Sequence, residues 1–243
     1  MKSKTKKLDV LAFGAHPDDV ELGCAGTLLT LAQQGYAAGI IDLTEGEMAS
    51  RGTVEERYKE AGESAKILKV VLRQNLKMSD AKIENNEENR NKIIEVVRRY
   101  KPTIVFAPNP DDRHPDHIHA GNLVTEGCFF AGLKKILPGI PHYRPAKIVY
   151  YMTTYEFNPT FVVDISDQFG EKIKALQSYR SQFYNPDWPG TETFVSSQWF
   201  MEALEFRARH FGWLAGVRYG EPFRIREKLA LDDIMPILSK SIM

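Results

Sequence analysis

Short apolar runs alternate with helical patterns along the first half of the chain, and this alternation restricts the fold more than any other feature. Apolar runs typical of buried β-strands cover residues 8–14, 37–44, 70–75 and 102–108. Helical patterns follow these runs at residues 28–35, from Thr53 onward, at 88–100 and at 120–133. Alternating strands and helices predict an α/β fold whose parallel sheet is covered by helices on both faces.

The second half is less regular but continues the same kind of pattern. Strands are predicted at residues 146–152 and 161–166, then a helix capped by Ser166 that runs to Phe183, and a long amphipathic helix at 193–214. Neither repeats nor a clear linker interrupt the chain. We therefore predict one domain over residues 1–243, with a flexible basic tail at 1–7 and a C-terminal tail at 230–243.

Composition excludes several classes of function. The chain has 32 basic and 32 acidic residues, so it lacks the positive charge of a nucleic-acid-binding protein. Its basic start leads into a strand pattern rather than a signal peptide, and no apolar stretch is long enough to span a membrane. Two cysteines, Cys24 and Cys128, do not make a disulfide framework and are expected to be buried thiols. We expect a cytoplasmic protein that binds neither nucleic acid nor membrane.

Two polar clusters stand directly after predicted strands. "GAHPDD" places His16, Asp18 and Asp19 after the first strand, and "DDRHPDH" places a second set, His114, Asp116 and His117, after the fourth. Ligands of open parallel sheets bind beyond the carboxyl ends of the strands. If the two strands are neighbours, all six side chains face one crevice.

The residue types in these clusters suit metal-assisted hydrolysis. Two imidazoles and a carboxylate can hold zinc or a similar divalent ion, and three protein ligands leave a position for water. The ion lowers the pKa of that water to about 7, and spare carboxylates or a spare histidine can act as general base and acid. His16 and Asp19 can converge on one ion while Asp18 stays free. The spacing of His114 and His117 does not decide which of them is a ligand.

Two other interpretations of the clusters are weaker. A single His-Pro-Asp can serve as a helix cap or core element, but two such clusters at equivalent strand ends favour a shared site. A phosphate site fails because the glycines lack the G-x-G-x-x-G spacing, no P-loop lysine is present, and two aspartates would repel an anion.

The paired motifs resemble a known family. "AHPDD" followed by "ELGCAGTL" and later "HPDH" is similar to the LmbE-like (PIG-L) family of zinc-dependent de-N-acetylases. The stretches "IIDLTEGEMASRGTVEERYKEA" and "VFAPNPDDRHPDHIHAGNLV" resemble its bacillithiol-biosynthesis branch, which deacetylates N-acetylglucosaminyl-malate. The resemblance spans roughly residues 8–220. It implies a Rossmann-like three-layer α/β/α sandwich with a mainly parallel sheet, a small N-acetylglucosamine conjugate as substrate, and a homo-oligomer, commonly a hexamer.

The same resemblance assigns the metal and the base. It makes His16, Asp19 and His117 the ligands of a Zn(II) ion and Asp18 the general base that deprotonates water. Fe(II), Co(II) and Mn(II) suit the same ligands, so the physiological metal stays open.

Four further residues take roles by resemblance. His114 stabilises the oxyanion or protonates the leaving amine, and Asp116 orients a nearby imidazole. Arg57 matches an arginine that holds the sugar or its aglycone, although a surface helix residue paired with a glutamate is the alternative. Arg113 flanks the motif and is a candidate for binding the malate carboxylates.

One position departs from the family pattern, and alternative functions stay open. Some members place a mobile tyrosine over the metal where this chain has Phe194, which cannot donate to an oxyanion; Tyr184, Tyr151 or His114 alone would then do so. Diacetylchitobiose and a lipid-linked glucosaminide are alternative substrates. Two alternative classes of function are a metal-dependent phosphohydrolase and a metal- or sugar-binding module without catalysis.

Overall fold

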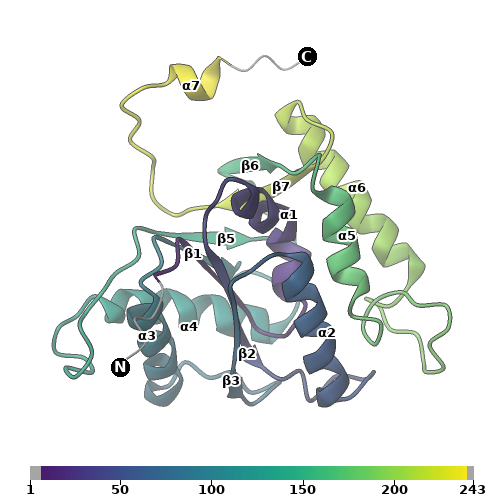
Figure 1. The fold of residues 1–243 in the computed structure, drawn as a ribbon, viewed down its shortest axis with the longest axis horizontal. Helices are drawn as coiled ribbons and strands as arrows, with labels where there is room; N and C mark the ends of the chain where they lie inside the picture. The colour runs from purple at the N-terminus through teal and green to yellow at the C-terminus, as the bar shows by residue number, and fades with distance from the viewer. Residues whose placement is uncertain (1–6, 240–243) are drawn as a thin grey trace.

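A mixed, mostly parallel β-sheet forms the centre of the molecule in a computed structural model that describes residues 7–239 (Figure 1). Its strands are β1 (Val10–Gly14), β2 (Ala38–Thr44), β3 (Leu72–Met78), β4 (Ile104–Pro108), β5 (Lys147–Tyr151), β6 (Phe161–Asp164) and β7 (Gly220–Arg224). Their order in the sheet is β3-β2-β1-β4-β5-β7-β6. The first five strands of this order pair in parallel, and β7 pairs antiparallel with both β5 and β6. The predicted mainly parallel sheet is confirmed.

Helices cover both faces of the sheet. They are α1 (Asp19–Gln33), α2 (Val54–Ile67), α3 (Glu87–Tyr100), α4 (Pro115–Ala131), α5 (Phe169–Gln177), α6 (Gln198–Ala215) and the short α7 (Met235–Leu238). Helices α3 and α4 lie on one face, and α1, α2 and α5 lie on the other (Figure 1). The expected three-layer α/β/α arrangement is therefore confirmed.

Strand β1 shows why the apolar runs are continuous rather than alternating. Leu11 and Phe13 pack into the core beneath α3 and α4, whereas Val10 and Ala12 pack against α1 on the opposite face. All five residues of the strand are buried. A strand that is covered on both faces needs apolar side chains at every position.

Helix α1 starts earlier than its sequence pattern predicts. The pattern indicates a helix from residue 28, but α1 begins at Asp19, the last residue of the first polar cluster, and is kinked at Cys24. Helix α2 begins as predicted, because Thr53 and Glu56 form a reciprocal capping box.

The predicted boundaries of α5 are wrong. Gln168, not Ser166, precedes the first turn, and the helix ends at Gln177 rather than at Phe183. The Ser166 hydroxyl instead donates to the Asp164 carboxylate at 2.6 Å, which forms a local turn.

The last helix and strand also differ from the pattern. Helix α6 begins at Gln198, later than expected, because the Ser197 hydroxyl accepts the Phe200 N–H and caps it there. Strand β7 has no counterpart in the sequence prediction. Its sequence "GEPFR" contains proline and two charged residues, and only its pairing with β5 and β6 makes it a strand.

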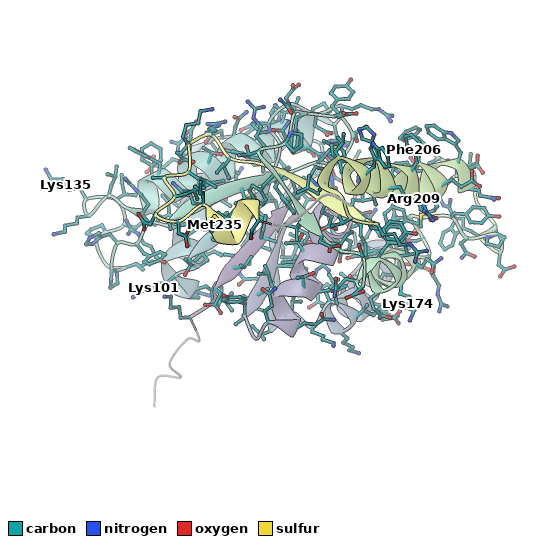
Figure 2. The ribbon with its side chains drawn as sticks, turned by 90° about the horizontal axis from the view of Figure 1, so that it is seen from above. Lys101, Lys135, Lys174, Phe206, Arg209 and Met235 are labelled. Atoms are coloured by element: carbon teal, nitrogen blue, oxygen red, sulfur yellow. The ribbon has the colours of Figure 1, made fainter. Side chains whose placement is uncertain are left out.

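The predicted N-terminal tail falls largely outside the described residues, whereas most of the predicted C-terminal tail lies within them. Residues 1–6 and 240–243 are not described, so the expected basic tail at 1–7 is not addressed, whereas residues 230–239 include α7. The exposed side chains of Phe206 and Arg209 extend from α6 (Figure 2). Within residues 7–239, no helix is long and apolar enough to cross a membrane.

Candidate active site

The two polar clusters meet at one edge of the sheet. Strands β1 and β4 are neighbours, with Val10 opposite Ile104, so the segments that follow their carboxyl ends lie together. The ring of His114 is 4.9 Å from the ring of His16 and also 4.9 Å from that of His117. The two clusters therefore lie together in space, as the sequence pattern predicts.

The turn between β1 and α1 brings the first cluster into this crevice. The His16 N–H donates to the Asp19 carboxylate at 2.8 Å, which closes the turn around Pro17. Asp18 has φ 130°, a backbone conformation that residues other than glycine rarely adopt. Gly14 has no room for a side chain, since a Cβ there would lie 2.9 Å from the His16 carbonyl oxygen. Backbone strain of this kind is typical of functional sites.

His117 is held between two carboxylates. Its Nδ1 lies 2.9 Å from Asp112 Oδ1, and its Nε2 lies 3.0 Å from Asp19 Oδ1. Asp112 is fixed in turn by the Thr153 hydroxyl at 2.6 Å and the Thr154 N–H at 2.9 Å. Sequence analysis missed Asp112, although it stands in the same "DDRHPDH" motif.

His16 has a similar arrangement. Its Nε2 lies 3.0 Å from Asp80 Oδ1, and its Nδ1 lies 3.4 Å from Asp19 Oδ2. Asp80 also accepts the Met48 N–H at 2.9 Å. Sequence analysis missed Asp80 as well, and the available signal was its position just after the third strand, at the same edge of the sheet.

The ligand set His16, Asp19 and His117 fits a divalent metal. One atom from each lies within 4.8 Å of the others. Each imidazole has one nitrogen anchored by a carboxylate outside the set and the other directed at Asp19, which is the usual arrangement of metal-binding histidines. A second group, His16, His114 and Asp116, satisfies the same distance. It fits less well, because it would use the His16 Nε2 that Asp80 already holds.

The electrostatics of the pocket favour a positive charge. Burial lowers the pKa of His117, but Asp19 and Asp112 outweigh it and raise that pKa to about 9. Burial likewise opposes charge on His16, yet Asp116, Asp19 and Asp80 raise its pKa well above the usual value. Carboxylates that pull protons onto two imidazoles also stabilise a cation placed between them.

Asp18 is paired with an arginine rather than free. Arg57 Nη1 lies 3.2 Å from Asp18 Oδ2 and donates to the Pro17 carbonyl oxygen at 2.8 Å. Arg57 is buried, so the alternative of a surface residue paired with glutamate is wrong. Burial raises the pKa of Asp18 to about 7, while the charge of Arg57 opposes that rise.

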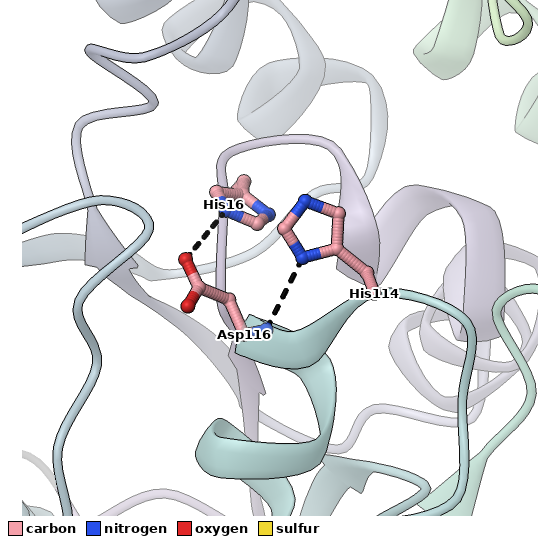
Figure 3. Close-up of side chains that lie close together, drawn as sticks. All are labelled: His16, His114 and Asp116. Carbon is pink, nitrogen blue, oxygen red and sulfur yellow. Dashed lines mark hydrogen bonds and ion pairs between the residues drawn. The ribbon is translucent and has the colours of Figure 1, made fainter.

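His114 and Asp116 are connected to His16 (Figure 3). The Asp116 N–H donates to His114 Nδ1 at 3.2 Å, and the Asp116 carboxylate lies 3.4 Å from His16 Nε2. Asp116 is itself fixed by the Ala81 N–H at 2.7 Å. A ring nitrogen that accepts an N–H carries no proton, so the proton of neutral His114 resides on Nε2.

A cavity of about 600 Å³ opens over these residues. It is lined by His16, Asp18, Asp19, His114 and His117 but not by Asp116, and by Arg51, Arg57, Arg113, Gln182, Phe194 and Phe200, among others. The Arg113 guanidinium stacks on the Phe194 ring at 4.6 Å, which places both residues at the cavity wall.

Among the described residues that line this cavity, neither Tyr151 nor Tyr184 is present. These are the tyrosines considered as oxyanion donors. The Tyr151 hydroxyl is buried and donates to the Phe13 carbonyl oxygen at 2.7 Å, so it cannot serve a substrate. Tyr184 lies in the exposed loop before α6. Of the candidates named from the sequence, His114 is therefore the donor that faces the cavity.

Comparison with known proteins agrees with this geometry. The family model described as PIG-L, GlcNAc-PI de-N-acetylase, matches residues 11–128, which include both polar clusters. The chain is 31% identical over 230 residues to diacetylchitobiose deacetylase of Thermococcus kodakarensis, covering 88% of this chain and 82% of that protein.

Two other proteins are similar over most of the chain. A probable N-acetyl-alpha-D-glucosaminyl L-malate deacetylase 2 of Bacillus anthracis is 27% identical over 194 residues, covering 72% of this chain and 81% of that protein. The crystal structure of a conserved Thermus thermophilus protein is 38% identical with a TM-score of 0.84, covering 93% of this chain and 98% of that one. The chain belongs to the PIG-L (LmbE-like) family of deacetylases.

Proposed function

We propose that this protein hydrolyses the N-acetyl group of an N-acetylglucosamine conjugate, using a divalent metal held by His16, Asp19 and His117. The observation that carries the proposal is the pair of imidazoles, each anchored by its own carboxylate, that converge on Asp19. A zinc ion bound there supplies Lewis acidity, which activates water and polarises the acetyl carbonyl.

Asp18 is the proposed general base. Its carboxylate lies beside the ligand set, and Arg57 fixes its orientation. Asp18 takes one proton from the attacking water while the new C–O bond forms at the acetyl carbon. When the C–N bond breaks, Asp18 returns that proton to the departing amine, so acetate and a free amino sugar leave.

His114 is the proposed oxyanion donor. Its Nδ1 accepts the Asp116 N–H, which leaves the Nε2 proton available to the oxygen that becomes negative during attack. Burial lowers the pKa of His114, so the ring is neutral, and a neutral imidazole is a hydrogen-bond donor but a weak acid. Between the two roles considered for His114, this supports oxyanion stabilisation over proton transfer to the amine. Asp116 acts as the residue that orients the ring.

The favoured substrate is N-acetylglucosaminyl-malate, which would place the enzyme in bacillithiol biosynthesis. The motifs of that branch and the similarity to the Bacillus anthracis protein support it. Diacetylchitobiose is the second candidate, supported by the 31% identity to the Thermococcus kodakarensis enzyme. Arg57 and Arg113, both at the cavity wall, are the proposed contacts for the sugar and for a malate carboxylate.

The test is acetate release by metal-stripped protein, with and without added Zn(II) or Fe(II). The substrates are N-acetylglucosaminyl-malate, diacetylchitobiose, N-acetylglucosamine and a set of phosphoesters. We expect metal to restore acetate release, fastest from the malate conjugate. Tight metal binding without acetate release from any substrate would favour the binding-module alternative, and phosphoester cleavage alone would favour the phosphohydrolase.

We also propose that the chain forms a homo-oligomer, with a hexamer as the expectation from the family. Support comes from α6, whose Trp199, Phe206 and Trp213 side chains are 61%, 71% and 81% exposed. Large exposed apolar surfaces are often interfaces. Light scattering after size-exclusion chromatography distinguishes a hexamer from a monomer.

A further inference from the structure

Arg51 is a cavity residue that the proposed chemistry does not use. It lies in the loop between β2 and α2, lines the cavity and is only 8% exposed. The Gln182 side-chain amide donates to the Arg51 carbonyl oxygen at 2.8 Å, which ties the loop to the segment after α5. The next residue, Gly52, has φ 72° and packs so closely on Ser181 that a Cβ would lie 2.6 Å from it. The backbone of Arg51 is therefore fixed in place.

Two guanidinium nitrogens of Arg51, Nε and Nη2, are buried without hydrogen-bond partners among the described residues. The face of Trp188 packs on the group, 5.1 Å from the ring centre, so the plane of the guanidinium is also held. A buried donor without an acceptor costs free energy, and the cost is larger for a charged group. A ligand that supplied acceptors would remove that cost.

Two other arginines of this chain, the partly buried Arg73 and the buried Arg98, show what these nitrogens bind. Arg73 donates through Nε and Nη2 to the two carboxylate oxygens of Asp42, both at 2.8 Å. Arg98 donates through Nε, Nη1 and Nη2 to backbone carbonyl oxygens. The two nitrogens that lack partners in Arg51, Nε and Nη2, are the same pair through which Arg73 binds the Asp42 carboxylate. This side-on fork suits a group with two oxygens in one plane.

Neighbouring charges leave the Arg51 fork available. Within residues 7–239, Arg51 forms no ion pair, and the carboxylate of Glu192 only opposes the lowering of its pKa by burial. Arg57 is committed to Asp18 and Pro17, and Arg113 is exposed and stacked on Phe194. Of these three cavity arginines, Arg51 is the one whose Nε and Nη2 atoms are both enclosed by protein and lack a hydrogen-bond partner in the described part of the chain.

We propose that Arg51 forms an anion subsite, whose Nε and Nη2 bind two oxygens of a carboxylate or phosphate on the substituent attached to the amino sugar. This inference rests on the proposed function, since it assumes that the acetyl group lies at His16, Asp19 and His117. It makes Arg51 the residue that selects anionic conjugates over neutral glycosides. An uncharged second sugar offers no group that neutralises the buried guanidinium.

The binding test uses metal-free protein and ligands without an acetyl group, so it does not depend on catalysis. Calorimetry compares glucosaminyl-malate, glucosamine 1-phosphate and methyl glucosaminide. Losing a two-pronged charged hydrogen bond weakens binding roughly 10- to 100-fold, so Arg51→Gln should weaken binding of the preferred anion by that factor and leave the methyl glycoside unchanged. Arg51→Lys keeps the charge without the fork and should lie between. Stronger binding of the malate or of the phosphate conjugate identifies which anion the fork accepts.

Two control variants isolate the subsite. Arg99→Gln removes an exposed arginine in the last turn of α3 and should leave all ligands unaffected. Glu192→Gln should not weaken binding of the anions. If Glu192→Gln and Arg51→Gln weaken binding equally, the two residues form a structural pair and the subsite is wrong.

An activity arm separates this inference from the proposed function. On a substrate with an anionic substituent, Arg51→Gln should raise KM roughly 10- to 100-fold with kcat little changed, while N-acetylglucosamine turnover stays the same. Equal losses on charged and neutral substrates, or unchanged discrimination in calorimetry, would overturn the anion subsite. Discrimination in calorimetry without acetate release from any substrate would keep the subsite and refute the deacetylase proposal.

Discussion

At the scale of single residues, the site is a set of polar side chains that hold one another in place. Asp112 and Asp80 each fix one histidine through a nitrogen that faces away from Asp19. Arg57 does the same for Asp18. His16 and His117 thus depend on two carboxylates that the sequence analysis missed, and Asp18 depends on Arg57, because side-chain orientation is set by such partners.

Asp112 should control metal affinity without contacting the metal. Asp112→Asn removes the negative charge that holds His117 Nδ1. Loss of such a partner typically lowers metal affinity roughly 10- to 100-fold. Competition with a chelator measures the change. The matched control is Asp111→Asn, an exposed neighbour in the same motif, which should bind metal like the unmodified protein. Equal affinities for the two variants would show that Asp112 does not act through His117.

Asp18 should affect turnover but not metal content. Asp18→Asn cannot accept the proton of water, and loss of a general base typically lowers kcat roughly 100- to 10,000-fold. Metal analysis should still find the ion, because the proposed ligands are unchanged. A variant that keeps its metal and near-normal turnover would refute the assignment of Asp18 as base.

At the scale of elements, the kink in α1 is stabilised from outside the helix. The Gly26 and Thr27 N–H groups donate to the Glu221 carboxylate from β7, at 2.9 Å and 2.7 Å. Lys172 of α5 pairs with Glu221 at 2.6 Å and donates to the Leu22 carbonyl oxygen at 2.9 Å. The backbone groups that the kink frees are therefore satisfied by two other elements.

Breaking this buried pair should destabilise the fold. Glu221→Gln leaves Lys172 buried without its counter-charge, and such changes typically cost about 3 kcal/mol of unfolding free energy. Urea unfolding measures the loss. The control is Glu171→Gln, which removes an exposed pair with Lys174 and should cost less than about 1 kcal/mol. If both variants unfold at the same urea concentration, the kink does not depend on Glu221.

At the scale of the whole molecule, the helices on both faces isolate the two cysteines from solvent. Cys24 is a residue of α1 and Cys128 is a residue of α4, and each packs into the core on its own face of the sheet. Burial raises the pKa of the Cys128 thiol to about 12 and that of Cys24 well above its usual value. The thiolate is the reactive form, so neither residue suits redox or nucleophilic chemistry.

Thiol titration tests this arrangement. We expect no reaction of the native protein with a disulfide reagent at neutral pH, and two reactive thiols per chain after unfolding in denaturant. Cys128→Ser should leave the native protein unreactive and reduce the unfolded count to one. Rapid labelling of the native protein would mean that α1 or α4 opens readily.

The sequence by itself determined the α/β class, the alternation of strands and helices along the first half of the chain, and the residue types of the site. These follow from local patterns: strands covered on both faces need continuous apolar runs, and the two polar clusters occupy the positions where such strands end. The start of α2 is also set by a local pattern, because the capping box that begins at Thr53 lies within one turn of the helix.

Tertiary structure alone decided the rest. Strand β7 exists because β5 and β6 supply its hydrogen bonds. Helix α5 ends at Gln177, and beyond it the Ser181 N–H donates to the Glu60 carboxylate of α2. The pairing of Asp18 with Arg57 and the packing of Arg51 on Trp188 join segments far apart in the chain. Periodicity reports which face of an element is buried, but it carries no information about which distant side chain meets it there. That is why the ligand types could be inferred from the sequence and their partners could not.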